Sequence, residues 1–229
     1  MNKKTSKHFY PAAVSFAAFV LWTLAVLFFD VHPIGPRGSS VGFSSLNLCF
    51  HNLTGVNMTL YTITDWAGLV PVGVGFFFAL LGLIEWIKRK SIFKVDFSIL
   101  VLGGFYLAVL AAYLFFEETP INCRPVLIGG YLETSYPSST TLLVLTVMPT
   151  AAIEFNFRIK NAPFRKGVVI LVWAVTIFMV VGRLLSGVHW LSDIIGGVLL
   201  SASLVLLYKG ICGLEKNKHN DSIKNRYDL

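Results

Sequence analysis

The sequence predicts an all-α integral membrane protein whose six transmembrane helices form one bundle. Composition is the first indication, because the 229 residues are 55% hydrophobic and 14% charged, whereas soluble domains contain about 25% charged residues. The second indication is segment length, since a hydrocarbon core of about 30 Å requires roughly 20 apolar residues per helix. Six windows satisfy this requirement: residues 9–29, 66–86, 97–116, 137–155, 167–187 and 190–208.

The first window, "FYPAAVSFAAFVLWTLAVLFF", follows Lys3, Lys4 and Lys7 and could therefore belong to a signal peptide. Its apolar run is long for a signal peptide, and it ends in "FDVHP" instead of a small-residue cleavage site. We therefore expect a retained helix.

Residues 30–65 separate the first and second windows. They carry "HPIGPRGSS", whose Gly and Pro residues predict turns. The remainder, "LNLCFHNLTGVNMTLYTITDW", has apolar residues at mixed spacing and predicts a short helix on the outer membrane surface. Cys49 in this segment and Cys123 could form a disulfide in an oxidising compartment or remain as two free thiols.

The distribution of Lys and Arg predicts the orientation, because cytoplasmic loops retain positive charge. With the N-terminus inside, 16 of the 19 basic residues are cytoplasmic, and only Arg37, Arg124 and Arg183 are outside. We expect an integral protein of a bacterial plasma membrane with both termini cytoplasmic. The net charge of +7 then indicates contact with anionic lipids at the cytoplasmic face and not nucleic-acid binding.

The chain has the organisation of one domain, residues 1–215, followed by a polar cytoplasmic tail, residues 216–229. Three acidic residues, Asp65, Glu85 and Glu154, fall near the ends of predicted helices, and we interpret them as boundary residues.

The stretch "VGRLLSGVHWLSDIIGG" places Arg183, His189 and Asp193 in an otherwise apolar region. Residues at i and i+4 share a helix face, so the Asp193 carboxylate can accept a hydrogen bond from one nitrogen of His189 and leave the other free. This is how a third group orients a base or nucleophile. His189 could instead be an interfacial residue that caps a helix, but intramembrane charges are functional by default.

Two further segments reach the same level of the membrane. Arg124 follows the third helix in "INCRP", and residues 136–141, "YPSSTT", open the fourth helix with backbone N–H groups suited to an anion. Because the planar guanidinium group donates two parallel hydrogen bonds, these elements together predict a phosphate site with a nucleophile. Alternatively, the arginines extend to lipid headgroups, and Ser138 and Thr140 are plain helix caps.

This arrangement resembles the type 2 phosphatidic acid phosphatase superfamily of membrane lipid phosphatases. The family pattern is Lys, six residues, Arg-Pro; then Pro-Ser-Gly-His; then Ser-Arg, five residues, His, three residues, Asp. The corresponding positions here are Glu117 with Arg124-Pro125, then Pro137-Ser138-Ser139-Thr140, then Gly182-Arg183 with His189 and Asp193. They extend from residue 117 to residue 193, and the six-helix layout extends the resemblance over nearly the whole chain.

The resemblance implies a phosphatase or phosphotransferase that acts on a membrane lipid phosphate or diphosphate, such as an isoprenyl diphosphate or a glycerolipid phosphate. It implies an outward-facing site, a phosphohistidine intermediate and neither a metal nor another cofactor. By position, the catalytic residues are His189 as the nucleophile and Asp193 as its partner. The implied phosphate-binding residues are Arg124, Arg183, Ser138 and Ser139.

Two ionisable residues of the family pattern are replaced. Glu117 replaces the Lys, and Thr140 replaces the His that protonates the leaving group. A hydroxyl cannot replace that acid, and a carboxylate near a phosphate is repulsive unless it is protonated or paired. Beside Glu118, Glu117 is most simply a solvated loop charge. The departures favour a noncatalytic relative that binds or transports a phosphorylated lipid, whereas the intact Arg183, His189 and Asp193 set favours an enzyme.

Overall fold

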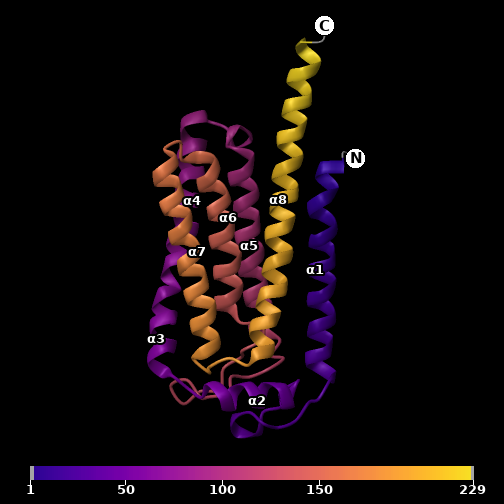
Figure 1. Cartoon of the computed structure of the whole chain (residues 1–229), viewed down its shortest axis with the longest axis vertical. Coiled ribbons are helices and arrows are strands. Elements are labelled where there is room, and N and C mark those ends of the chain that lie inside the picture. The colour runs from indigo at the N-terminus through magenta and orange to yellow at the C-terminus, as the bar shows by residue number, and fades with distance from the viewer. Residues whose placement is uncertain (1–2, 228–229) are drawn as a thin grey trace.

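The structure is a computed structural model that describes residues 3–227 of the chain, with side chains described for residues 8–215. The described residues form an all-helical bundle, as the sequence predicts (Figure 1). Its helices are α1 (Lys3–Phe28), α2 (Ser44–Thr54), α3 (Met58–Ala67), α4 (Leu69–Arg89), α5 (Phe97–Glu118), α6 (Ser139–Arg158), α7 (Ala162–Leu185) and α8 (Leu191–Tyr227), with short 3-10 turns at Pro36–Gly38 and Ile92–Lys94.

Within the part of the chain that the structure describes, six segments are long and apolar enough to cross a membrane, which confirms the predicted number. The second begins earlier than predicted, because α3 continues almost directly into α4 and the two together form a span at Met58–Arg89. The Asn57 side chain starts this span by accepting a hydrogen bond from the backbone N–H of Leu60 at 2.9 Å. Only α2 therefore matches the surface helix predicted in residues 30–65, and it lies across one end of the bundle (Figure 1).

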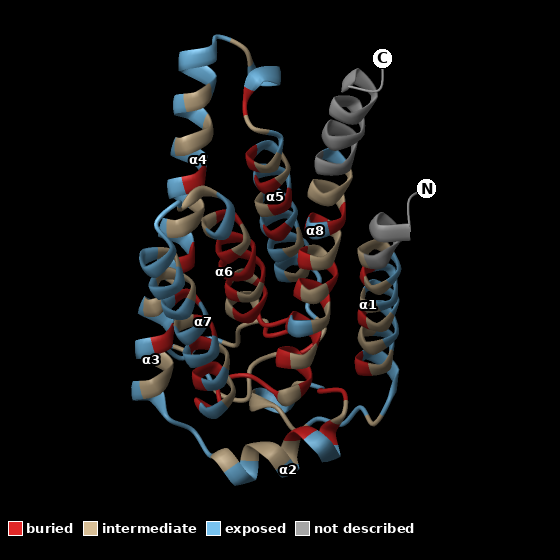
Figure 2. Cartoon of the chain, turned by 45° about the horizontal axis from the view of Figure 1, so that its top comes forward, coloured by how far each residue is buried: buried red, intermediate tan, exposed pale blue. Residues whose placement is uncertain are grey.

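Helix α6 lies at the centre of the bundle and packs against α7 and α8. It has the lowest mean hydropathy of the six spans. In the 18-residue stretch that qualifies each helix as a span, 61% of α6 is buried, compared with 28% of α7 and 11% of the α3–α4 span. Figure 2 shows the same contrast, with buried residues concentrated in α6 and exposed ones on the outer helices. Since lipid accepts apolar side chains freely, the more polar helix is the one covered by protein.

The end of the bundle that carries both termini (Figure 1) contains a network of charged side chains. Arg158 of α6 lies 2.8 Å from Glu154, 3.2 Å from Asp96 and 3.6 Å from Glu85. The Tyr208 hydroxyl of α8 also donates to Glu154 at 2.6 Å. The interpretation of Glu85 and Glu154 as simple boundary residues is therefore wrong. Arg158 as a partner of Glu85, and Tyr208 as a partner of Glu154, belong to helices distant in sequence, which the local pattern does not reveal.

Two smaller predictions concern the tail and the cysteines. Helix α8 extends to Tyr227, so most of the polar segment 216–229 continues this helix. Cys49, Cys123 and Cys212 are free thiols, which agrees with the free-thiol alternative for the first two.

Candidate active site

The candidate site lies at the end of the bundle opposite the termini, where a tight turn joins α7 to α8. Gly187 in this turn has a φ of 66°, and a Cβ added there would lie 1.9 Å from the carbonyl oxygen of Gly55. Glycine is therefore required both for the backbone conformation and for close approach to the preceding loop. The turn places Arg183, in the last turn of α7, near His189, which precedes α8.

The His189 and Asp193 side chains are both buried and face each other. His189 Nδ1 lies 3.6 Å from Asp193 Oδ2, which is an ion-pair distance but longer than a hydrogen bond. The carboxylate is fixed by other donors, because Oδ2 accepts from the backbone N–H of Trp190 at 3.0 Å and Oδ1 accepts from Asn122 Nδ2 at 3.1 Å. The two side chains are adjacent as predicted, but His189 precedes α8 and does not share a helix face with Asp193, and the direct hydrogen bond is absent from this structure.

The second nitrogen of His189 faces Arg124. Arg124 Nη1 lies 3.0 Å from His189 Nε2, and since a guanidinium can only donate, Nε2 must be the acceptor. The ring proton of the neutral imidazole is then on Nδ1, toward Asp193. The expectation that one nitrogen would be free is wrong for this structure. Arg124 itself is held through Nε by the Glu133 carboxylate at 2.9 Å.

The electrostatic environment keeps His189 neutral. Burial, and then the nearby Arg124 charge, lower the pKa of His189 to about 4, although Asp193 opposes this shift. At neutral pH the imidazole therefore retains a lone pair on Nε2. An uncharged, oriented histidine in contact with an arginine can act as a nucleophile toward an anion that the arginine binds.

Arg183 is only 2% exposed, and its guanidinium has a defined set of partners. Nη2 donates to Asp65 Oδ1 at 2.6 Å and to Thr140 Oγ1 at 2.8 Å, while Nε and Nη1 are buried without a hydrogen-bond partner. The guanidinium carbon lies 4.8 Å from the centre of the Tyr61 ring, and that of Arg124 lies 6.0 Å from it. Asp65 is thus a partner of Arg183, and the boundary interpretation of Asp65 is wrong.

The N-terminus of α6 combines capping and cavity-lining residues. Ser138 is completely buried, and its Oγ accepts a hydrogen bond from Thr141 Oγ1 at 3.0 Å and a longer one from the Thr141 backbone N–H. Its own N–H donates to the Asp193 carbonyl oxygen at 3.1 Å. Ser138 therefore has the capping role that the sequence left open. The N–H groups of Ser139 and Thr140 belong to the first turn and have no intrahelical acceptor.

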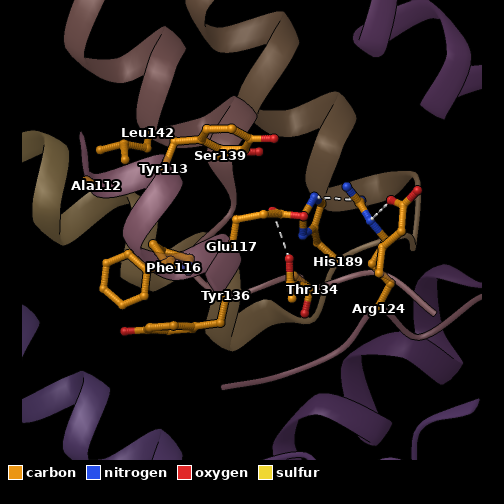
Figure 3. Close-up of a pocket in the computed structure, with 13 residues that line it drawn as sticks. Ala112, Tyr113, Phe116, Glu117, Arg124, Thr134, Tyr136, Ser139, Leu142 and His189 are labelled. Atoms are coloured by element: carbon orange, nitrogen blue, oxygen red, sulfur yellow. Dashed lines mark hydrogen bonds and ion pairs between the residues drawn. The ribbon is translucent and has the colours of Figure 1, made fainter. Parts of the chain in front are cut away.

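A cavity of about 200 Å³ opens beside His189 (Figure 3). Arg124, Ser139 and Glu117 contribute polar groups to its wall. Glu117 lies in the last turn of α5, where its carboxylate accepts a hydrogen bond from Thr134 Oγ1 at 2.9 Å, so it is part of the site and not only a solvated loop charge. Aromatic side chains cover another part of the wall and offer an apolar surface: Tyr113, Phe116 and Tyr136.

The structure adds contacts that sequence reasoning missed. Asn122 and Trp190 immediately flank the segments that carry Arg124 and His189, and the Trp190 indole N–H donates to the Cys123 carbonyl oxygen at 2.7 Å. Tyr61 and Asp65 are four positions apart in the sequence, which is a signal that they share one face of α3. Among the residues with described side chains, no group of three or more His, Cys, Asp or Glu residues is arranged to hold a metal ion.

Comparisons with known proteins agree on the architecture. The model of the PAP2 superfamily matches residues 72–212. The crystal structure of the first transmembrane PAP2 type phosphatidylglycerolphosphate phosphatase from Bacillus subtilis is similar, with a TM-score of 0.57 and 20% sequence identity over 89% of this chain and 96% of that chain. No curated protein matches the chain. The matched region contains Arg124, Arg183, His189 and Asp193, but it begins after α3.

Proposed function

The chain belongs to the PAP2 superfamily, and from this premise we propose that it is a membrane phosphatase or phosphotransferase that uses His189 as its nucleophile. The main support is the contact between His189 Nε2 and Arg124 Nη1 at the wall of the cavity. This contact places an uncharged nucleophile next to a group that binds a phosphoryl oxygen. The aromatic wall of the same cavity suits a lipid substrate.

The proposed reaction proceeds through a phosphohistidine. A phosphoryl group bound by Arg124 and Arg183 takes over the hydrogen bond that Arg124 now donates to His189. The released Nε2 lone pair attacks phosphorus, the bond to the leaving oxygen breaks, and the developing imidazolium is stabilised by Asp193 on its Nδ1 side. Water, or the hydroxyl of an acceptor, then attacks phosphorus and breaks the P–N bond.

Thr140 points to a preference for diphosphates. Expulsion of an alkoxide requires a proton, because its conjugate acid has a pKa near that of water, ~15.7, whereas a phosphate leaving group has a pKa of about 6. General acid catalysis contributes a factor of about 100 to 10,000, and the Thr140 hydroxyl, which accepts a hydrogen bond from Arg183, cannot supply it. We infer that an isoprenyl diphosphate is the preferred substrate, unless Glu117 in the cavity wall retains a proton and serves as the acid.

We also propose an orientation for the site. The termini and most of the basic residues share one end of the bundle, and positive charge marks the cytoplasmic side. The site at the opposite end then acts on lipids of the outer leaflet, while the basic end contacts anionic headgroups. In a bacterial cell envelope this location suits the recycling of an isoprenyl carrier.

The first experiment measures turnover of a panel of lipid phosphates by the purified protein. His189→Ala should abolish turnover, and Asp193→Asn should reduce it by up to about 10,000-fold, the effect of the equivalent change in a Ser-His-Asp triad. Activity should also survive a chelator, because the mechanism uses no metal. Full turnover by His189→Ala, or its loss on chelation, would contradict the proposal.

The second experiment compares a matched isoprenyl monophosphate and diphosphate. The unmodified protein should turn over the diphosphate faster, and Thr140→His should narrow the difference by restoring an acid for the monophosphate. If the monophosphate is faster and Glu117→Gln has no effect, the preference is wrong. Binding of both lipids without turnover of either would support the noncatalytic alternative, which the replacements at Glu117 and Thr140 favour.

A further inference from the structure

We propose that α3 is a positioning element of this site, in which Tyr61 and Asp65 hold Arg183 in the orientation that binds phosphate. The inference rests on the proposed function, because it assigns Arg183 to a phosphoryl group. It concerns residues outside the part of the chain that the family model matches, which begins at residue 72. It also gives a reason for Gly182, which stands where the family pattern has Ser.

Asp65 fixes one end of the guanidinium. Its Oδ1 lies 2.6 Å from Arg183 Nη2, and the Asp65 side chain is 56% exposed whereas that of Arg183 is 2% exposed. A buried cation requires a partner of opposite charge, and the Asp65 carboxylate provides it. Nη2 is also bound to Thr140, so it is fully engaged, while the buried Nε and Nη1 donors are left for an anionic ligand.

The Tyr61 ring restricts the movement of the Arg183 guanidinium on a second side. Its ring lies 4.8 Å from the Arg183 guanidinium and 6.0 Å from that of Arg124, both within the range of cation–π attraction. Tyr61 therefore attracts both proposed phosphate-binding arginines and offsets part of the repulsion between them. Tyr61 and Asp65 are one helical turn apart, so a single face of α3 supplies both contacts.

Gly182 allows α3 to reach this position. A Cβ added at Gly182 would lie 2.6 Å from Thr64 Cγ2. Thr64 is completely buried, and its hydroxyl donates to the carbonyl oxygens of Leu60 and Tyr61, both at 2.9 Å, which fixes its side chain. Any larger residue at position 182 must displace α3, and with it Tyr61 and Asp65.

The test measures binding of inorganic phosphate by the purified full-length protein, from the rise in thermal midpoint with phosphate concentration. Asp65→Asn and Tyr61→Leu should each raise the dissociation constant about tenfold, as expected for loss of one interaction with a charged group. Tyr61→Phe should bind phosphate normally because it retains the ring. Thr62→Ala, an exposed position on the same helix, is the matched control and should also bind normally.

Gly182→Ser is a second, independent variant and should weaken phosphate binding through displacement of α3. Unchanged phosphate affinity in Asp65→Asn and Tyr61→Leu would overturn the inference. Tighter binding in Asp65→Asn would also overturn it, because Asp65 would then mask Arg183. Absence of phosphate binding by the unmodified protein would also overturn the inference. Phosphate binding without turnover of any lipid would refute the proposed enzyme and leave the positioning role intact, so the two failures are distinguishable.

Discussion

His189 and Arg124 illustrate how two neighbouring residues set the reactivity of the site. Burial, followed by the charge of the Arg124 guanidinium, lowers the pKa of His189 to about 4. Arg124→Gln should therefore raise the pKa of His189 toward its ordinary value of 6.5. A histidine that must be neutral to attack loses activity at low pH, so the acid limb of kcat/KM should move to higher pH in the variant.

The measurement is the pH profile of kcat/KM for the unmodified protein and for Arg124→Gln with the same substrate. Ionisation of the substrate contributes equally to both profiles, so the difference reports the enzyme. Arg124→Gln should also lower kcat/KM at neutral pH, because it removes a donor to phosphate. Superimposable acid limbs would show that Arg124 does not influence the titration of His189.

Burial of His189 also predicts a pH dependence of stability. The folded pKa is about 4 and the unfolded value is about 6.5, so the unfolded chain binds the proton first as the pH falls. Stability should therefore decrease between pH 6.5 and pH 4, by up to about 3 kcal/mol from this residue alone. The thermal midpoint in detergent should decrease less over this range in His189→Gln, and equal slopes for the two proteins would contradict this assignment.

At the scale of single residues, the sequence predicted the composition of the site better than its contacts. Arg124, His189 and Asp193 come together as the spacing suggested. Asp65 was missed because its partner, Arg183, is 118 residues away in the chain, and no local pattern reports such a pairing. The hydrogen bond from Arg124 to His189 Nε2 was not predicted for the same reason.

At the scale of elements, the turn between α7 and α8 controls the position of His189. Gly187→Ala should destabilise the protein by more than the ~1–2 kcal/mol of a left-handed residue, because the added Cβ also meets the Gly55 carbonyl oxygen. We expect a lower thermal midpoint and reduced turnover. Gly103→Ala in α5 is the control, since a Cβ there meets nothing within 4 Å, and it should leave the midpoint unchanged or raise it.

Hydrophobicity located the six spans but not all their ends. Windows rich in leucine and phenylalanine are readily detected, because helices that face lipid have strongly apolar sequences. The mixed spacing of apolar residues in the segment that contains α3 predicts a surface helix. The structure shows that Thr64 and Asp65 are used for contacts with α7, and such tertiary use is not visible in local hydropathy.

At the scale of the whole molecule, orientation is the property to test. In a background without the three native cysteines, Ser40→Cys at the site end should react with an impermeant thiol reagent in intact cells, whereas Lys94→Cys at the terminal end should react only after permeabilisation. Both positions are exposed, so access to the aqueous phase is the only difference expected. The reverse pattern would place the site on the cytoplasmic side.

The pairing of α1 with α8 has a consequence for biosynthesis. Helix α1 packs chiefly on α8, where Trp22 Nε1 donates to the Ser192 carbonyl oxygen and Ser203 Oγ donates to the Ala12 carbonyl oxygen. The start of α8 leaves the ribosome roughly 160 residues after the end of α1, a delay on the order of 10–30 s at ordinary elongation rates. During that interval α1 resides in the bilayer without its partner, so its whole circumference must be compatible with lipid. The bundle closes only when the last span has been inserted.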